Sequence, residues 1–144
     1  MPNFNDARIS RLYVTQTGVD VQDESPNAAP PGAPAPNFDL HLEMEAGGGV
    51  AGKYTLFTIA YDVSTGDNEP LLNPSAAGNL NGANKDFAVD PPWKLTGNDR
   101  HFEQKETIAV PAAAKNHIFF YTVALVSENA QIVDVAQSDH FILL

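Results

Sequence analysis

Apolar and polar residues alternate without a break between Phe38 and Glu45. The apolar positions are Phe38, Leu40, Leu42 and Met44, and the polar positions between them are Asp39, His41, Glu43 and Glu45. A period of two places successive side chains on opposite faces of a strand, so the pattern predicts a strand with one buried and one solvent-exposed face. Glycines 47–49 then predict a hairpin turn, because glycine readily adopts positive φ.

A second strand is predicted from Tyr54 to Val63, but its alternation changes phase. Tyr54 and Leu56 share one parity, whereas the later apolar residues share the other, namely Phe57, Ile59, Tyr61 and Val63. Either a β-bulge interrupts the strand between Leu56 and Phe57, or both faces of the strand are covered. Covering both faces requires a neighbour, which is either another part of this chain or another subunit.

Further strand patterns cover 8–21 with a bend at Gly18, and then 102–110, 117–127, 131–135 and 139–144. The segment 25–36 is rich in proline and alanine, and proline lacks the N–H that a sheet interior requires. We therefore expect 25–36 to be an extended connector within the domain. The segment 64–100 is rich in Gly, Pro and Asn and is predicted to be one long irregular loop, with room for a short edge strand near Asp86–Val89.

About seven strands without an amphipathic helix predict the all-β class, as a single antiparallel β-sandwich that spans 1–144 as one domain. From Thr107 to Leu144 the chain has an alternating strand, a short Pro-Ala turn and a strand that carries Tyr121-Thr122-Val123. This layout resembles the E, F and G strands of immunoglobulin-like and fibronectin-III-like domains. In that resemblance Val123 takes the place of the second core cysteine. The resemblance implies an architecture and transfers no functional residue.

The chain of 144 residues has 18 acidic and 8 basic residues and a formal net charge of −10. Such a surface repels phosphate groups, so we expect neither nucleic acid nor an anionic membrane as a partner. The chain has no cysteine, which excludes disulfides, thiol nucleophiles and thiolate metal sites. No apolar run approaches the ~20 residues of a membrane span, and the first residues lack the character of a signal peptide. The expectation is a soluble protein without membrane insertion, with the cytoplasm favoured.

Candidates for metal or catalytic chemistry lack the patterns that such chemistry needs. The histidines, His41, His101, His117 and His140, lie on different predicted elements without metal-ligand spacing. The acidic stretch Asp62, Asp67, Asn68 and Glu69 offers oxygen ligands for calcium, but it lacks the alternate-position pattern of a calcium loop and fits a solvated turn. Asp99-Arg100-His101 with Glu103 is the best arrangement for a hydrolase, but no nucleophile motif accompanies it. We expect no metal, no cofactor and no enzyme activity.

Trp93 follows Pro91-Pro92 in the predicted long loop. An indole held by stiff backbone can stack on a sugar ring or anchor a partner, and it can also plug the open end of a sandwich. We favour the plug. If the loop binds a ligand instead, the predicted site residues are Trp93, Asp67, Asn68 and His101.

Two functions follow from these patterns. The first is a non-catalytic β-sandwich that serves as a structural building block or self-associates as a homo-oligomer, because 54–63 and 117–126 carry more apolar surface than one core needs. The alternative is a module that binds carbohydrate or another ligand through the 64–100 loop around Trp93. A separate prediction concerns Phe141–Leu144, which we expect to pair beside 117–127 and pack into the core, since exposed apolar residues there would promote aggregation.

Overall fold

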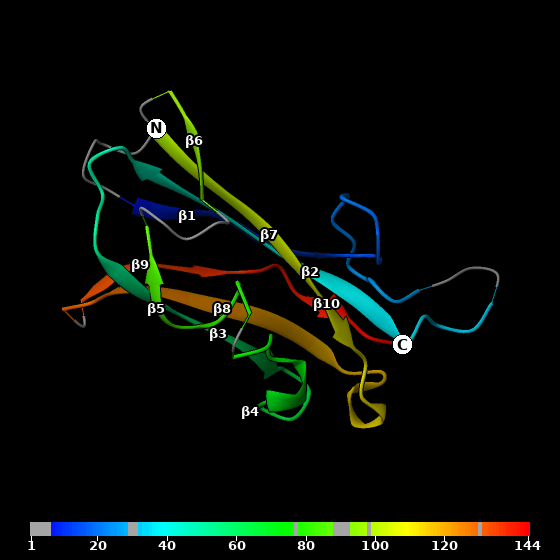
Figure 1. The fold of residues 1–144 in the computed structure, drawn as a ribbon. Coiled ribbons are helices and arrows are strands. Elements are labelled where there is room, and N and C mark those ends of the chain that lie inside the picture. The colour runs from blue at the N-terminus through cyan, green and yellow to red at the C-terminus, as the bar shows by residue number, and fades with distance from the viewer. Residues whose placement is uncertain (1–6, 29–31, 77, 88–92, 98, 130) are drawn as a thin grey trace.

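A computed structural model describes residues 7–28, 32–76, 78–87, 93–97, 99–129 and 131–144. Their regular secondary structure is almost entirely β, and the strands form two antiparallel sheets packed face to face (Figure 1). The predicted all-β sandwich is therefore confirmed. Within the described residues, no helix is both long enough and apolar enough to cross a membrane.

Sheet A has four strands in the order β1-β2-β7-β6. Their bounds are Ala7–Thr15 for β1, Asn37–Gly47 for β2, Trp93–Thr96 for β6 and Asp99–Ala109 for β7. β2 and β7 pair along their whole length, from Asn37 opposite Ala109 to Gly47 opposite Asp99. Sheet A is thus built around one long ladder, with β1 and the short β6 at its edges.

Sheet B has six strands, with the order β10-β8-β3-β4 and with β9 also paired to β8 and β5 to β3. Their bounds are Lys53–Asp62 for β3, Asp67–Asn68 for β4, Gly82–Asp86 for β5, Ile118–Ser127 for β8, Ile132–Gln137 for β9 and Phe141–Ile142 for β10. Two 3₁₀ turns connect strands, η1 at Pro70–Leu72 and η2 at Ala112–Ala114. One side of the sandwich is closed where the backbone N–H of Ile9 donates to the Asp134 carboxylate at 2.7 Å, joining β1 to β9.

The core lies between the sheets and contains the inward side chains of both. β2 contributes Phe38, Leu40, Leu42 and Met44, and β8 contributes Phe119, Tyr121, Val123 and Leu125, all of them buried. The hydroxyl of Tyr121 donates to the carbonyl oxygen of Leu72 at 2.6 Å, which ties η1 to the core. The alternation between Phe38 and Glu45 therefore identified the core face of β2 correctly.

The other face of β2 is not uniformly solvent-exposed, which corrects the sequence-based expectation. Asp39 and His41 are both buried. The Asp39 carboxylate accepts hydrogen bonds from the backbone N–H of Gly18 and the hydroxyl of Thr107, and the His41 ring bonds the hydroxyl of Thr15. The segment after β1 and the neighbouring strands cover these two residues, while Glu43 and Glu45 remain partly exposed.

β3 pairs with β8 without a register shift from Tyr54 to Asp62. Its inward residues are Tyr54, Leu56, Thr58, Ala60 and Asp62, all buried, and its outward residues include Phe57 and Ile59. The alternation is therefore continuous, and no β-bulge interrupts the pairing of β3 with β8. A register irregularity between Tyr54 and Leu56 occurs only in the pairing of β3 with β5. Thr58 and Ala60 are weakly apolar residues on the inner face, which made that face look interrupted.

The segment 64–100 is more structured than one irregular loop. It contains β4, η1, β5 and β6, and it includes the start of β7. The strand in this region is β5, which ends at Asp86, so it precedes the range expected at Asp86–Val89 and shares only Asp86 with it; Phe87 is in a turn, and Val89, Pro91 and Pro92 lie outside the described residues. These strands are two to five residues long, so periodicity could not reveal them.

The end of the chain is placed as predicted. β10 pairs with β8, with Phe141 opposite Phe119 and Ile142 opposite Ile118. Phe141 and Leu143 are buried in the core. The side chain of Asn27 also bonds both backbone groups of Leu144, so the connector between β1 and β2 holds the last residue in place.

Candidate functional site

Sheet B presents an apolar surface on the side that faces away from the core. We call it the outer apolar face. It consists of Phe57, Ile59, Tyr61 and Val63 from β3 and the residue after it, Ile118, Phe120, Ala124 and Val126 from β8, and Val135 from β9.

The strand pairing makes these side chains contiguous. Phe57 lies opposite Ala124, which in turn lies opposite Val135 on β9. Tyr61 lies opposite Phe120, and their ring centroids are 5.2 Å apart. Cross-strand neighbours on one face of a sheet are close enough to form a continuous surface. The outer apolar face therefore extends across three adjacent strands.

Several of these residues are far more exposed than large apolar side chains usually are. Phe57 is 51% exposed, Val135 53% and Ile118 41%. With Ile59 and Val63, they leave roughly 400 Å² of apolar surface open to solvent, which is within the range of the largest and often functional patch on a monomeric protein. Tyr61, Phe120 and Val126 are half-buried and extend this surface.

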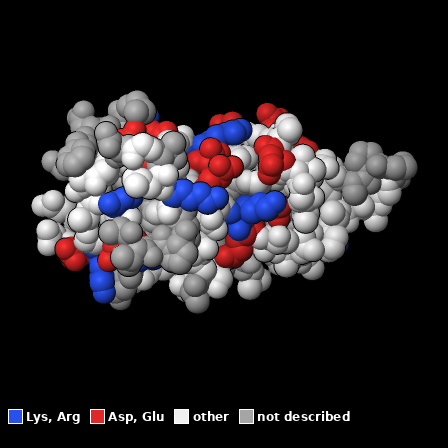
Figure 2. Space-filling view, turned by 45° about the horizontal axis from the view of Figure 1, so that its top comes forward, with Lys and Arg blue, Asp and Glu red and all other residues white. Residues whose placement is uncertain are grey.

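The outer apolar face carries no charge. On the outward positions of β3 and β8, from Thr55 to Val63 and from Ile118 to Val126, none of the described residues is acidic or basic. The outer side of sheet A is the opposite case, because Glu43, Glu103 and Lys105 lie there with other charged groups, and Figure 2 shows acidic and basic side chains interspersed on this side. A protein with a net charge of −10 thus has a stretch of sheet surface, across the middle of β3 and β8, that carries no charge.

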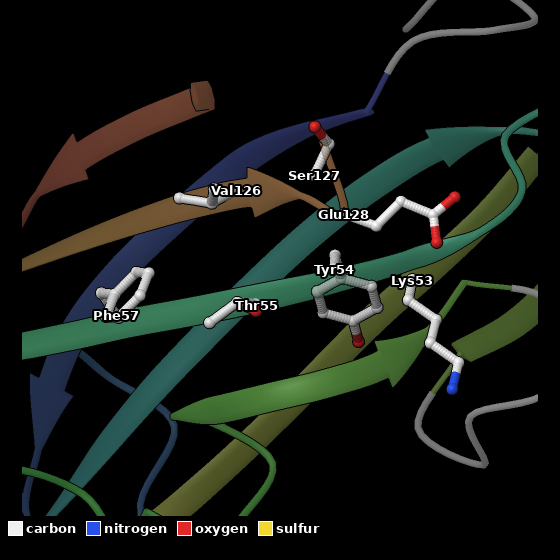
Figure 3. Close-up of a pocket in the computed structure, with 7 residues that line it drawn as sticks. All are labelled: Lys53, Tyr54, Thr55, Phe57, Val126, Ser127 and Glu128. Atoms are coloured by element: carbon white, nitrogen blue, oxygen red, sulfur yellow. The ribbon is translucent and has the colours of Figure 1, made fainter. Parts of the chain in front are cut away.

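One end of the outer apolar face is hollowed. An open pocket of about 320 Å³ is lined by Lys53, Tyr54, Thr55, Phe57, Val126, Ser127 and Glu128 (Figure 3). The backbone N–H of Glu128 donates to the carbonyl oxygen of Lys53 at 3.0 Å, so the two charged residues sit across the ends of β3 and β8. The pocket combines an apolar wall with one cation and one anion at its rim.

Trp93 lies at the start of β6 and not in a loop, and only 9% of it is exposed. Its ring packs on Phe102 and Phe87 at centroid distances of 5.3 and 5.4 Å, and its Nε1–H donates to the hydroxyl of Tyr54 at 2.8 Å. The indole therefore fills one end of the space between the sheets. Little of its ring surface is available for stacking on a ligand.

The other predicted ligand-binding residues do not share a site with Trp93: Asp67 and Asn68 lie together on sheet B, and His101 pairs with Lys94 on sheet A, one position from Trp93. Asp67 and Asn68 are exposed on β4, where Asn68 lies opposite Tyr61. Trp93 instead bonds Tyr54, which is seven strand positions and so about 23 Å from Tyr61 along β3. His101 is on the outer side of sheet A, opposite Glu45. The structure does not bring the predicted set together into one site.

A second, polar hollow of about 320 Å³ lies on the outer side of sheet A and is lined by Asp20, His41, Lys94, Glu103, Gln104 and Lys105. The His41 ring stacks on Tyr13 with centroids 4.6 Å apart. Burial lowers the pKa of His41, and the nearby carboxylates of Asp39 and Asp20 only partly oppose this. Burial and the Glu43 carboxylate raise the pKa of Tyr13 to about 12. Both rings are therefore neutral near pH 7.

Asp62 and His117 form a pair at the end of sheet B. His117 Nδ1 lies 2.7 Å from the Asp62 carboxylate, which also accepts hydrogen bonds from the backbone N–H groups of Ser64 and Thr65. Burial alone would raise the pKa of Asp62, but these hydrogen bonds outweigh it and lower the pKa. The carboxylate orders the turn after β3. Within the described ranges, no group of three or more acidic or histidine side chains is arranged to hold a metal ion.

No protein-family model matches this chain, and no curated protein matches it. Among solved structures, it is similar to a Bacteroides fragilis protein described as a "putative beta-galactosidase", with 12% sequence identity and a TM-score of 0.48. That alignment covers 94% of this chain and 17% of the other, so this chain spans less than a fifth of that protein's length.

Sequence reasoning recognised excess apolar surface on 54–63 and 117–126 but did not identify the residues that form the outer apolar face. The sequence did contain a signal for this face, because apolar residues alternate at odd-numbered positions in 57–63 and at even-numbered positions in 118–126. Phe57, Ile59, Tyr61 and Val63 alternate on β3, and Ile118, Phe120, Ala124 and Val126 occupy the even positions of β8. Pairing β3 with β8 brings these two outward sets together, and only the pairing shows that they share one face.

Proposed function

We propose that this protein is a non-catalytic β-sandwich that self-associates through the outer apolar face of sheet B. The observation that carries the proposal is the contiguous, uncharged set of exposed apolar side chains on β3, β8 and β9. Water contact with such a surface is unfavourable, and packing two copies face to face removes it from water.

A second copy is an occupant of suitable size and chemistry. If the exposed residues of two copies meet, they bury about 800 Å² in total, and the half-buried Tyr61, Phe120 and Val126 bring the contact to the ~1,000 Å² that a specific interface needs. Two identical uncharged faces are also self-complementary, whereas the chain's strong negative charge would oppose contact through most other surfaces. The apolar excess on β3 then has a physical reason.

Replacement of Phe57 by lysine tests this proposal. Phe57 exposes roughly 100 Å² of ring, so its loss from both copies together with burial of two ammonium groups should weaken the dimer at least about 100-fold. Sedimentation equilibrium over a wide range of protein concentration measures the dissociation constant. Because the side chain is half-exposed in the single chain, Phe57→Lys should change the melting temperature of the monomer little.

Leu95→Lys is the matched control, because Leu95 is 68% exposed on β6 of sheet A and lies away from the proposed contact. It should associate like the parent chain. If the parent sediments as a 15.5 kDa monomer at all concentrations, or if Phe57→Lys associates as well as Leu95→Lys, the proposal is wrong.

A further inference from the structure

Lys53 and Glu128 are the charged residues that line the pocket at one end of the outer apolar face, and Asp86 lies opposite Lys53 on β5. Lys53 begins β3 and Glu128 follows β8 directly, and the backbone bond between them fixes them at the same level of the sheet. Both line the pocket that Phe57 and Val126 also line. They mark one end of the face with a cation on the β3 side and an anion on the β8 side.

These two charges do not neutralise each other within one copy. No ion pair of the described residues joins Lys53 to Glu128. Figure 3 shows their side chains directed away from each other, with the Glu128 carboxylate on one side of β3 and the Lys53 ammonium on the other. Neither Lys53 nor Glu128 forms an ion pair with a described residue of its own copy, although Asp86 is the neighbour of Lys53 across the sheet. Because a charge at the rim of an apolar contact loses water when the contact forms, an opposite charge from the partner stabilises it there.

Face-to-face sheets pack with their strands within about 30° of one another, so a two-fold axis in the contact plane runs either along the strands or across them. An axis along the strands places β3 of one copy over β8 of the other. Lys53 of each copy then lies over Glu128 of the other, twice in the dimer. At the opposite end of the face, Val63 meets Ile118.

An axis across the strands gives the opposite outcome. The Lys53 end of one copy would then cover the far end of β3, and the Glu128 end would cover the far end of β8. Those far ends are Val63 and Ile118, which are apolar and both partly exposed. Each charge would lose water against an aliphatic side chain, which is unfavourable.

From this geometry we infer that two copies associate with parallel sheet B strands, and that reciprocal Lys53–Glu128 contacts select this orientation. The inference rests on the proposed function, because it assigns the partner and its orientation to the same face. The two charged residues act as specificity determinants, and the apolar side chains between them supply the contact area.

Charge reversal with mixing tests the inference. In Lys53→Glu alone, each contact sets two carboxylates against each other, and in Glu128→Lys alone it sets two ammonium groups against each other. Each variant should therefore dimerise about tenfold more weakly than the parent, as expected for two exposed pairs turned from attractive to repulsive. An equimolar mixture pairs unlike copies and replaces these repulsions: one contact joins the two original residues, and the other joins the two substituted ones with their charges exchanged. The mixture should recover the parent dissociation constant to within about threefold, and sedimentation equilibrium of each variant and of the mixture measures these values.

The mixture separates contacts between copies from effects within one copy, because mixing leaves the charges of each chain unchanged. Lys94→Glu, which makes the same change of charge on exposed β6 of sheet A, is the control and should neither weaken the dimer nor gain from mixing with Glu128→Lys. The inference is overturned if the mixture stays as weak as the single variants, or if the single variants dimerise like the parent. In both cases a dimer that Phe57→Lys still disrupts leaves the proposed function standing, whereas a dimer that is insensitive to Phe57→Lys refutes the proposed function itself.

Discussion

The buried carboxylate of Asp62 should make a large and pH-dependent contribution to stability. It accepts hydrogen bonds from two backbone N–H groups, of Ser64 and Thr65, and lies 2.7 Å from His117 Nδ1. Asp62→Ala leaves these groups without their acceptor, at a cost of about 2–4 kcal/mol at pH 7 when the bonds to a charged group are taken together. For a chain of this size, that loss lowers the melting temperature by roughly 6–15 °C.

The pH dependence follows from the lowered pKa of Asp62 in the folded state. A carboxyl group that is more acidic when folded stabilises the fold above its unfolded pKa of about 3.9, and the stabilisation is lost as the pH falls through the folded-state pKa. The difference in unfolding free energy between the parent and Asp62→Ala should therefore be full at pH 7 and shrink in strong acid.

Urea unfolding followed by circular dichroism at several pH values between 7 and 2 measures this difference. Asp67→Ala is the control, because Asp67 is exposed on β4 and should contribute less than about 0.5 kcal/mol. The reasoning fails if Asp62→Ala is as mild as Asp67→Ala at pH 7. It also fails if the deficit of Asp62→Ala stays constant down to pH 2.

Two further predictions concern the core. Tyr54→Phe removes the hydroxyl that accepts the Trp93 Nε1–H bond, so it should destabilise the fold by about 1–3 kcal/mol. The buried indole should keep a blue-shifted fluorescence emission, and a red-shifted, readily quenched emission in the parent chain would contradict the burial of Trp93. Deletion of Phe141–Leu144 removes the buried side chains of Phe141 and Leu143, each worth about 1.5–3 kcal/mol, and breaks the hydrogen bonds to Asn27. The truncated chain should therefore be unfolded or insoluble, and a soluble product with nearly the parent melting temperature would show that β10 is dispensable.

The parts of the fold that the sequence predicted are those with long, regular alternation. β2 and β8 carry enough apolar positions in one parity for their inner faces to be identified. The C-terminal strand was predicted on a different ground, because the consecutive apolar residues Phe141–Leu144 would promote aggregation if they were exposed. The strands inside 64–100 were missed because two to five residues cannot establish a period. The burial of Asp39 and His41 was missed for a different reason: their cover comes from Gly18, Thr15 and Thr107, and these contacts exist only once β1, β2 and β7 are assembled.

The phase change in β3 shows how a correct observation led to an incomplete interpretation. Thr58 occupies an inner position that an apolar residue would normally fill, and its hydroxyl donates to the carbonyl oxygen of Leu80, so it is buried without an unpaired polar group. Because threonine is a polar residue, Thr58 interrupts the apolar pattern of the inner face in the sequence. The outer face carries Phe57 and Ile59 and reads as the more apolar of the two. The candidate site was therefore visible as an anomaly of pattern, but its extent required the pairing with β8 and β9.

The distribution of charge favours the outer apolar face as the surface for the proposed self-association of this acidic chain. The charged outer side of sheet A and the outer apolar face of sheet B lie on opposite surfaces of the sandwich (Figure 1). Sheets pack about 10 Å apart, so contact through sheet B leaves the sheet A charges of two copies separated by roughly 30 Å, several times the ~8 Å screening length at physiological salt. Contact through sheet A would instead bring Glu43 and Glu103 of both copies together and bury them. Electrostatic repulsion and the hydrophobic effect therefore favour the same face for the proposed contact between copies.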